Sequence, residues 1–201
     1  MNDLDAVRHR LRDLLLERSV RIGDFTLASG ARSDYYVDAR PTTMCAEGQA
    51  LVGRLGLHML AEAGWAPSHV GGLTLGADPI AYALAHRSFL DGAPIDAFTV
   101  RKQAKAHGTG RRIEGGLPEG AAVVVIEDSV TSGGSALQAI EAVRAHGCSV
   151  LGVLALVDRD EGGRERLAGA GYLLRAAFSG PELRDAARAQ SSSRSGMTRQ
   201  R

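Results

Sequence analysis

The chain has 201 residues, of which 44% are hydrophobic, and its formal net charge at pH 7 is +1. This length and apolar content are sufficient for one well-buried domain, and the near-neutral charge disfavours nucleic-acid binding as the main activity. No apolar run approaches the roughly 20 residues of a membrane span, and the first residues, MNDLDAVRHR, do not resemble a secretory signal. We therefore expect a cytoplasmic protein that binds neither membranes nor nucleic acids.

Helical and strand patterns alternate along most of the chain. Apolar residues at helical spacing predict helices over residues 4–15 and 45–63, with two short strands, 25–27 and 35–38, between them. Further strands are predicted near residues 70–75, 95–100, 121–126, 150–157 and 172–178. Because helical patterns separate several of these strands, we predict an α/β fold with a central parallel sheet flanked by helices. The two short strands are expected to form a small hood over a pocket.

The C-terminal part of the chain changes character after the last predicted strand. One more helix is predicted over residues 183–189, and the sequence from residue 190 onward, QSSSRSGMTRQR, is polar and lacks periodicity. We therefore predict a single domain over residues 1–180 and a disordered tail over residues 190–201.

The most informative segment is residues 123–136, which read VVVIEDSVTSGGSA. Its apolar start has no polar alternation, which is typical of a central parallel strand covered on both faces. Glu127 and Asp128 then fall at the carboxyl end of that strand, where ligands bind in open α/β sheets. Two carboxylates there could accept hydrogen bonds from a sugar diol or face a bound cation.

A turn rich in hydroxyl groups and glycine follows at residues 131–135. Gly133 and Gly134 permit backbone angles closed to other residues, so several N–H groups can converge on an anion where the next helix begins. The segment could be only a tight connection, but paired acids directly before such a turn exceed what a connection needs. The lysine of a nucleotide-triphosphate P-loop and the spaced glycines of a dinucleotide fingerprint are both absent. The pattern predicts a pocket for a ribose and its phosphate.

A long polar segment precedes this motif. Residues 101–115 read RKQAKAHGTGRRIEG, and Lys102, Lys105, Arg111 and Arg112 contribute to its positive charge. Loops of this length are usually lids or disordered segments, and an isolated charge run is usually a solvated surface. Beside an anion pocket, however, a mobile cationic lid would suit a pyrophosphate leaving group on which charge develops.

Several motifs together resemble those of the type I phosphoribosyltransferases, and of the orotate phosphoribosyltransferases in particular. They are residues 25–40 (FTLASGARSDYYVDAR), 71–79 (GGLTLGADP), 101–115, 123–136 and 157–163 (VDRDEGG). The resemblance covers roughly residues 4–178 in sequence order. It implies the type I phosphoribosyltransferase fold and an enzyme of pyrimidine biosynthesis. That enzyme would transfer the phosphoribosyl group of 5-phosphoribosyl 1-pyrophosphate to orotate, giving orotidine 5-phosphate and pyrophosphate.

The resemblance also implies roles for individual residues. Glu127 and Asp128 would hold the ribose diol, and Thr131 would also touch orotate. Catalytic roles fall on Lys102, Lys105, His107 and Asp128. Substrate contacts are implied for Arg101, Glu127, Asp128, Ser129, Val130, Thr131, Ser132, Gly133, Gly134, Ser135, Arg159, Tyr36, Val37, Thr74, Leu75 and Gly76.

Three further expectations follow from the resemblance. Mg²⁺ would be bound mainly through the pyrophosphate of the substrate, and we expect no dedicated metal site in the protein. The protein would be a homodimer whose catalytic loop reaches into the neighbouring subunit's active site. Arg159 would pair with orotate, because a guanidinium can make two parallel bonds to a planar anion. It could instead be an ordinary surface arginine paired with Asp158 or Asp160.

The chain departs from the family at two positions. Some members carry lysine where this sequence has Ala28 and Gly76. Arg32, Arg40 and Arg87 are candidates to supply the missing charges, although a scattered arginine is more often solvated or structural.

The segment 74–78 allows two interpretations. It could bind pyrophosphate through backbone N–H groups, with Gly76 allowing close approach of the ligand. It could equally be a plain strand-to-helix turn capped by Asp78 before Pro79.

Two other functions stay open from the sequence. The base could be a purine or uracil, although Arg159 and the RKQAK loop argue against it. The protein could also be a regulator that senses phosphoribosyl pyrophosphate and binds RNA or DNA. That function would need an added basic surface or a DNA-binding domain, and neither is evident.

Overall fold

The structure, a computed structural model, describes residues 3–26, 32–103 and 112–198. It is built on a six-stranded sheet with the order β5-β4-β3-β6-β7-β8. The strands are β3 (His69–Leu73), β4 (Asp96–Val100), β5 (Ile113–Glu114), β6 (Ala122–Val130), β7 (Ser149–Asp158) and β8 (Leu174–Ser179). All neighbouring pairs are parallel except β4 and β5, which confirms the predicted fold class.

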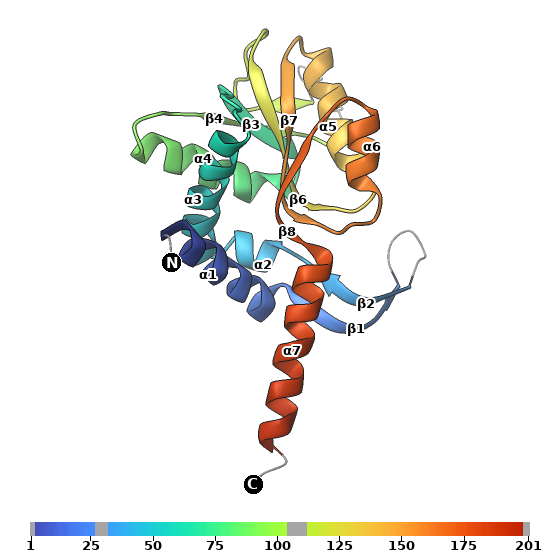
Figure 1. Cartoon of the computed structure of the whole chain (residues 1–201). Helices are drawn as coiled ribbons and strands as arrows, with labels where there is room; N and C mark the ends of the chain where they lie inside the picture. The colour runs from blue at the N-terminus through green and yellow to red at the C-terminus, as the bar shows by residue number, and fades with distance from the viewer. Residues whose placement is uncertain (1–2, 27–31, 104–111, 199–201) are drawn as a thin grey trace.

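Helices cover both faces of this sheet (Figure 1). One core lies between the sheet and α1 (Asp3–Arg18), α3 (Ala46–Glu62) and α4 (Ala77–Leu90), and the other between the sheet and α5 (Gly134–Ala145) and α6 (Gly163–Gly169). Val124 and Ile126 of β6 belong to the first core, and Val123 and Val125 belong to the second. Because successive strand residues point to opposite faces, both faces of β6 must be apolar. This explains the unbroken apolar run in the sequence.

A second, smaller sheet is formed by β1 (Val20–Thr26) and β2 (Arg32–Val37). The two strands are antiparallel and longer than predicted, with Val20 opposite Val37. In Figure 1 this pair lies beside the last helix, α7, and apart from the main sheet. The short helix α2 (Arg40–Thr43) follows β2.

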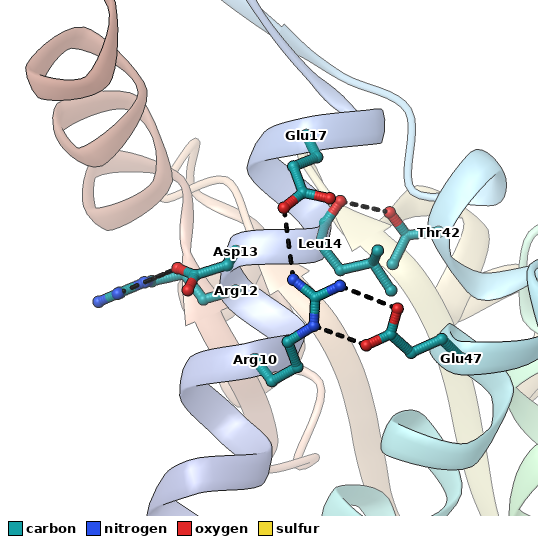
Figure 2. Close-up of polar contacts among 7 residues, drawn as sticks. All are labelled: Arg10, Arg12, Asp13, Leu14, Glu17, Thr42 and Glu47. Atoms are coloured by element: carbon teal, nitrogen blue, oxygen red, sulfur yellow. Dashed lines mark hydrogen bonds and ion pairs between the residues drawn. The ribbon is translucent and has the colours of Figure 1, made fainter. Parts of the chain in front are cut away.

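Figure 2 shows how α1 holds the segment that follows β2. Arg10 donates to the two carboxylate oxygens of Glu47 on α3 at 2.6 and 2.9 Å, and the Thr42 hydroxyl donates to the Leu14 carbonyl at 3.3 Å. The Thr42 contact is buried and shielded from water, whereas the exposed ion pair of Arg10 contributes little. These contacts fix α2, whose first residue is Arg40.

β6 is longer at its carboxyl end than the sequence predicts. The strand was expected to stop at residue 126, but it pairs with β7 as far as Val130, opposite Asp158. Glu127 and Asp128 therefore lie within the last part of the strand. Hydrogen bonds from the neighbouring strand extend it, and local residue preference does not encode such long-range pairing.

The last helix is longer than the sequence predicts. A helix was expected only over residues 183–189, but α7 (Gly180–Thr198) continues well beyond them. Pro181 lies in its first turn, where a missing N–H is tolerated, and Leu183 is fully buried. The packed start removes the cost of helix nucleation, so the helix can propagate into polar sequence. Among the described residues, no helix combines the length and the apolar content needed to cross a membrane.

Candidate functional site

Two adjoining hollows contain most of the predicted site residues. The first, which we call the acid hollow, has a volume of about 270 Å³ and is lined by Tyr36, Val37, Asp38, Arg40, Leu73, Thr74, Leu75, Gly76, Lys102, Glu127, Asp128 and Ser135. The second, the glycine hollow, has a volume of about 160 Å³ and is lined by Glu127, Ser129, Val130, Thr131, Ser132, Gly133, Gly134, Ser135 and Ala136. Glu127 and Ser135 line both, so the two hollows form one divided site. Larger hollows beside Arg8 and beside His146 contain none of the predicted site residues.

Glu127 occupies the boundary between the hollows. Its side chain is buried, and its Oε1 has no hydrogen-bond partner within the part of the chain that the structure describes. Burial, and then the neighbouring charge of Asp128, raise the pKa of Glu127 from 4.5 to about 8. A ligand that donates hydrogen bonds to this carboxyl would replace its missing solvation.

Asp128 is the second acid of the acid hollow. Its Oδ1 accepts a hydrogen bond from the backbone N–H of Ser129 at 2.8 Å. Burial raises the pKa of Asp128, and the backbone hydrogen bonds oppose that shift. The strand thus presents two adjacent carboxyl groups that are largely withdrawn from water.

The glycine hollow is shaped by the turn between β6 and α5. Gly133 has a φ of +73°, a left-handed conformation that side chains rarely adopt, and α5 begins at the next residue. Among the described residues, no side-chain hydrogen bond caps the N-terminus of this helix. The N–H groups of its first turn and its positive dipole end are thus suited to an anion.

Residues 74–76 connect β3 to α4 along one wall of the acid hollow. The peptide bond between Thr74 and Leu75 is cis. A Cβ atom at Gly76 would lie only 2.6 Å from Asp128 Oδ1, so glycine lets the turn approach the acid. A lysine here, which some family members carry, would require the Asp128 side chain to shift.

Asp78 does not cap α4, which corrects one interpretation of this segment. The N-cap residue of the helix is Gly76, with no side-chain capping bond. The Asp78 carboxylate instead accepts hydrogen bonds from the Thr74 and Thr99 hydroxyls at 2.7 and 2.9 Å.

Two cationic side chains line the acid hollow, Arg40 and Lys102. Arg40 makes two parallel bonds to Asp38, from Nε to Oδ1 at 2.8 Å and from Nη2 to Oδ2 at 2.9 Å. Three arginines were considered as replacements for the missing lysines, and of these only Arg40 lines either hollow. Arg87, on α4, pairs with Asp91, which follows that helix, and Arg32 lies on β2.

The basic loop is described only at its two ends. Arg101 pairs with Glu114 across the loop, with Nε and Oε1 2.9 Å apart, and does not line either hollow. Lys105 and His107, the other predicted catalytic residues, lie outside the described residues, as does Ala28.

Arg159 is not a surface arginine. It is only 4% exposed, its Nε donates to the Tyr35 hydroxyl at 3.1 Å, and its guanidinium carbon lies 4.3 Å from the centre of the Tyr35 ring. Its Nη2 lies 3.0 Å from Glu161 Oε1 without hydrogen-bond geometry. The alternative pairing with Asp158 or Asp160 is wrong, because Arg159 forms its ion pair with Glu161, and Asp158 pairs with Arg164. Arg159 lies outside the lining of both hollows, next to Val130 through a backbone hydrogen bond of 2.8 Å.

Sequence reasoning placed Tyr36 and Val37 at the site but did not single out their neighbours Tyr35 and Asp38. Asp38 lines the acid hollow directly, and Arg40 was considered only as one of three scattered arginines. Tyr35 is buried against Arg159, whereas Tyr36 is 41% exposed and packs on Phe25 with ring centres 5.6 Å apart. The alternation of side chains along β2 was the signal that could have separated the two tyrosines.

Comparisons with known proteins agree on one family. The model of the phosphoribosyl transferase domain matches residues 47–173. The orotate phosphoribosyltransferase of Aquifex aeolicus is 47% identical over 179 residues, which cover 88% of this chain and 97% of that protein. The orotate phosphoribosyltransferase of Mycobacterium tuberculosis is 46% identical over 176 residues, covering 88% of this chain and 96% of that protein.

Solved structures give the same picture. A crystal structure of the Mycobacterium tuberculosis orotate phosphoribosyltransferase in complex with Fe(III) dicitrate matches with a TM-score of 0.78 at 46% identity, covering 88% of this chain and 98% of that chain. A crystal structure of the Mycobacterium tuberculosis enzyme in complex with 5-phospho-alpha-D-ribosyl 1-diphosphate matches with a TM-score of 0.72 at 38% identity. It covers 89% of this chain and 92% of that chain.

Proposed function

This chain belongs to the orotate phosphoribosyltransferase family, and we propose that its divided site transfers a phosphoribosyl group from phosphoribosyl pyrophosphate to orotate. The products are orotidine 5-phosphate and pyrophosphate, and the reaction belongs to pyrimidine biosynthesis.

The observation that carries the proposal is the position of Glu127 between the two hollows. Phosphoribosyl pyrophosphate carries a phosphate at one end of its ribose and a pyrophosphate at the other. The glycine hollow suits the single phosphate, because it contains the uncapped first turn of α5. The acid hollow, with Arg40, Lys102 and the turn 74–76, suits the pyrophosphate. Glu127, which lines both hollows, and the neighbouring Asp128 would then face the ribose diol.

The protein's part in the reaction is positioning and charge stabilisation. Glu127 and Asp128 accept hydrogen bonds from the ribose hydroxyls and hold the anomeric carbon in place, which is worth most when the reacting atoms are close and aligned. Positive charge that develops on the ribose lies beside these two carboxyl groups. Lys102 is placed to neutralise charge on the departing pyrophosphate, and no covalent intermediate with the protein is required.

The donor set fits Mg²⁺ held chiefly by the substrate. Glu127 and Asp128 offer carboxyl oxygens, and Oε1 of Glu127 has no partner in the described structure. The described residues contain no group of three or more side chains that could hold a metal ion by themselves. Bound through pyrophosphate, Mg²⁺ would neutralise part of the leaving group's charge.

Orotate recognition is assigned to Arg159, Tyr36, Val37 and Thr131. Tyr36 and Val37 line the acid hollow, and Thr131 lines the glycine hollow. Arg159 offers a buried Nη2 that makes no hydrogen bond within the described residues. Its guanidinium is positioned by the Tyr35 ring and hydroxyl, and a guanidinium is suited to a planar carboxylate ligand.

The assembly is what the family resemblance implies, and the location is the one expected from the sequence. We propose a cytoplasmic homodimer in which the basic loop, with Lys105 and His107, completes the neighbouring subunit's site. Arg101 and Lys102 then mark where that loop leaves β4.

The experiment that tests this function follows the ultraviolet absorbance of orotate when purified protein meets phosphoribosyl pyrophosphate and Mg²⁺. Adenine, hypoxanthine and uracil are offered in parallel reactions. Loss of orotate absorbance only in the complete mixture supports the assignment. Consumption of another base would refute the roles of Arg159 and Tyr36 but leave the phosphate pocket in place. Binding of phosphoribosyl pyrophosphate without any reaction would favour a sensor.

A further inference from the structure

Asp78 is a buried carboxylate beside the acid hollow that the proposed reaction does not use. It lies in the first turn of α4 and is only 6% exposed. A buried carboxylate is costly unless hydrogen bonds replace its lost water. It is also unexpected next to a site for pyrophosphate, because the two negative charges repel each other.

The hydrogen bonds of Asp78 form a chain with a fixed direction. Thr74 and Thr99 donate to its two oxygens at 2.7 and 2.9 Å. Tyr82 and Thr99 hydroxyls lie 3.1 Å apart, and since the Thr99 proton is already donated to Asp78, Tyr82 must donate to Thr99. A charged acceptor thereby orients hydroxyl groups from three different elements.

These contacts join the two parts of the site that surround the pyrophosphate position. Thr74 lines the acid hollow, and its N–H donates to the carbonyl of Val100 at 2.9 Å. Thr99 belongs to β4, three residues before Lys102, which also lines the acid hollow. Asp78 therefore bridges the turn 74–76 and the strand from which the basic loop leaves.

We propose that Asp78 is a positioning residue for the pyrophosphate half of the substrate, an assignment that rests on the proposed function. It fixes the turn 74–76 and the base of the basic loop relative to each other. Because the Thr74 hydroxyl donates to Asp78, it is not available to donate to pyrophosphate, and the turn would hold that group through its backbone N–H groups. The helix dipole at the start of α4 favours this carboxylate.

Positioning and electrostatics predict opposite effects for Asp78→Asn. Removing a negative charge beside a pyrophosphate should tighten binding if charge alone mattered. In asparagine, however, an NH₂ donor replaces one of the two carboxylate oxygens, and each threonine donates to a different oxygen, so the amide cannot accept from both threonines in the observed geometry. Weaker binding of pyrophosphate would thus identify loss of position as the dominant effect.

The test compares Asp78→Asn, Thr99→Val and Thr99→Ser with a matched control, Ser88→Ala. Ser88 is a buried hydroxyl on the same helix that donates to Ala85 and accepts from Ile95, both at 2.8 Å. It lies about 15 Å along the helix axis from Asp78. Its loss should lower stability without moving the site.

For each variant we would measure kcat, the KM for phosphoribosyl pyrophosphate, the KM for orotate and the melting temperature. Calorimetry would give the dissociation constant of inorganic pyrophosphate with Mg²⁺. Asp78→Asn and Thr99→Val should raise both the KM for phosphoribosyl pyrophosphate and the dissociation constant of pyrophosphate by about tenfold. This is the factor expected for one lost hydrogen bond to a charged group. The KM for orotate should stay within about twofold, and Thr99→Ser should restore the wild-type values.

Ser88→Ala should lower the melting temperature and leave pyrophosphate binding unchanged. The same result for Asp78→Asn and Thr99→Val would overturn the proposal. Tighter pyrophosphate binding by Asp78→Asn would overturn it as well. If Asp78→Asn does not fold, the pair Thr99→Val and Thr99→Ser decides by the same criteria. A wild-type protein that binds pyrophosphate but does not consume orotate would instead refute the proposed function.

Discussion

At the scale of single residues, Glu127 is a carboxyl group that is withdrawn from water. It is buried at the boundary of two hollows, and Oε1 has no partner among the described residues. Many proteins place an aliphatic side chain or a paired polar group in such a position. An unpaired carboxyl there indicates a site prepared for a ligand that brings its own hydrogen-bond donors.

The raised pKa of Glu127 predicts how stability depends on pH. Because its pKa rises from 4.5 to about 8 on folding, the folded protein binds the proton more tightly than the unfolded chain does. The contribution of Glu127 to stability is therefore fully present below about pH 4.5 and is lost as the pH rises towards 8. Glu127→Gln should remove this loss and melt at a higher temperature than the wild type at pH 8.

Melting curves between pH 5 and pH 8.5, without ligand, check this expectation. Glu141→Gln, which changes an exposed carboxyl on α5, is the control and should follow the wild-type curve. Parallel pH profiles for wild type and Glu127→Gln would contradict the assigned burial.

At the scale of elements, the small sheet is attached to the main sheet through Tyr35 and Arg159. The two residues are 124 positions apart in sequence, and Arg159 Nε donates to the Tyr35 hydroxyl at 3.1 Å. A Cβ atom at Gly180 would lie 2.3 Å from that hydroxyl, so the start of α7 also packs closely against Tyr35. β2, the end of β7 and the start of α7 therefore converge at one buried contact.

Tyr35→Phe should weaken this attachment. It removes the acceptor of a buried guanidinium donor, and we expect the free energy of unfolding to fall by roughly 1–3 kcal/mol. Urea unfolding measures the change. Tyr36→Phe, at the exposed neighbouring position, should stay within about 0.5 kcal/mol of the wild type, and equal effects of the two substitutions would argue against a special role for Tyr35.

The elements also show what could be predicted from the sequence. The run of valines before Glu127 identified the central strand, because a strand covered on both faces has no polar side. Glycine at a helix end is another local signal, and Gly64 and Gly147 have φ values of +68° and +85° where α3 and α5 end. The extension of β6 to Val130 depends on pairing with β7, and the burial of Arg159 depends on Tyr35. Neither partner can be identified from residue patterns nearby in the sequence.

The candidate site shows the same difference between features that are local in sequence and features that depend on distant residues. The acids and the glycine turn are adjacent in sequence, and their roles follow from that order. The pairing of Arg40 with Asp38 and the bonds of Asp78 to Thr74 and Thr99 depend on where the chain folds back.

At the scale of the whole molecule, α7 divides into a packed and a projecting part. Leu183 is fully buried, and Ala186 and Ala187 pack against the same core. Beyond them the helix extends away from the sheets (Figure 1). The packed part of α7 thus belongs to the core of the α/β unit.

Removal of residues 190–201 should therefore leave the protein folded. We expect the melting temperature to change by no more than about 2 °C, since surface changes away from the core are usually worth less than about 0.5 kcal/mol. Leu183→Ala in the full chain is the contrasting variant and should cost about 2–5 kcal/mol. Loss of folding on truncation would show that the projecting part has a structural role.

The most direct test of the account is a crystal structure of this protein with phosphoribosyl pyrophosphate and Mg²⁺. We predict the 5-phosphate in the glycine hollow against residues 131–135, the ribose diol on Glu127 and Asp128, and the pyrophosphate beside Thr74, Gly76 and Lys102. A substrate bound in the reverse direction, or outside the two hollows, would contradict the account.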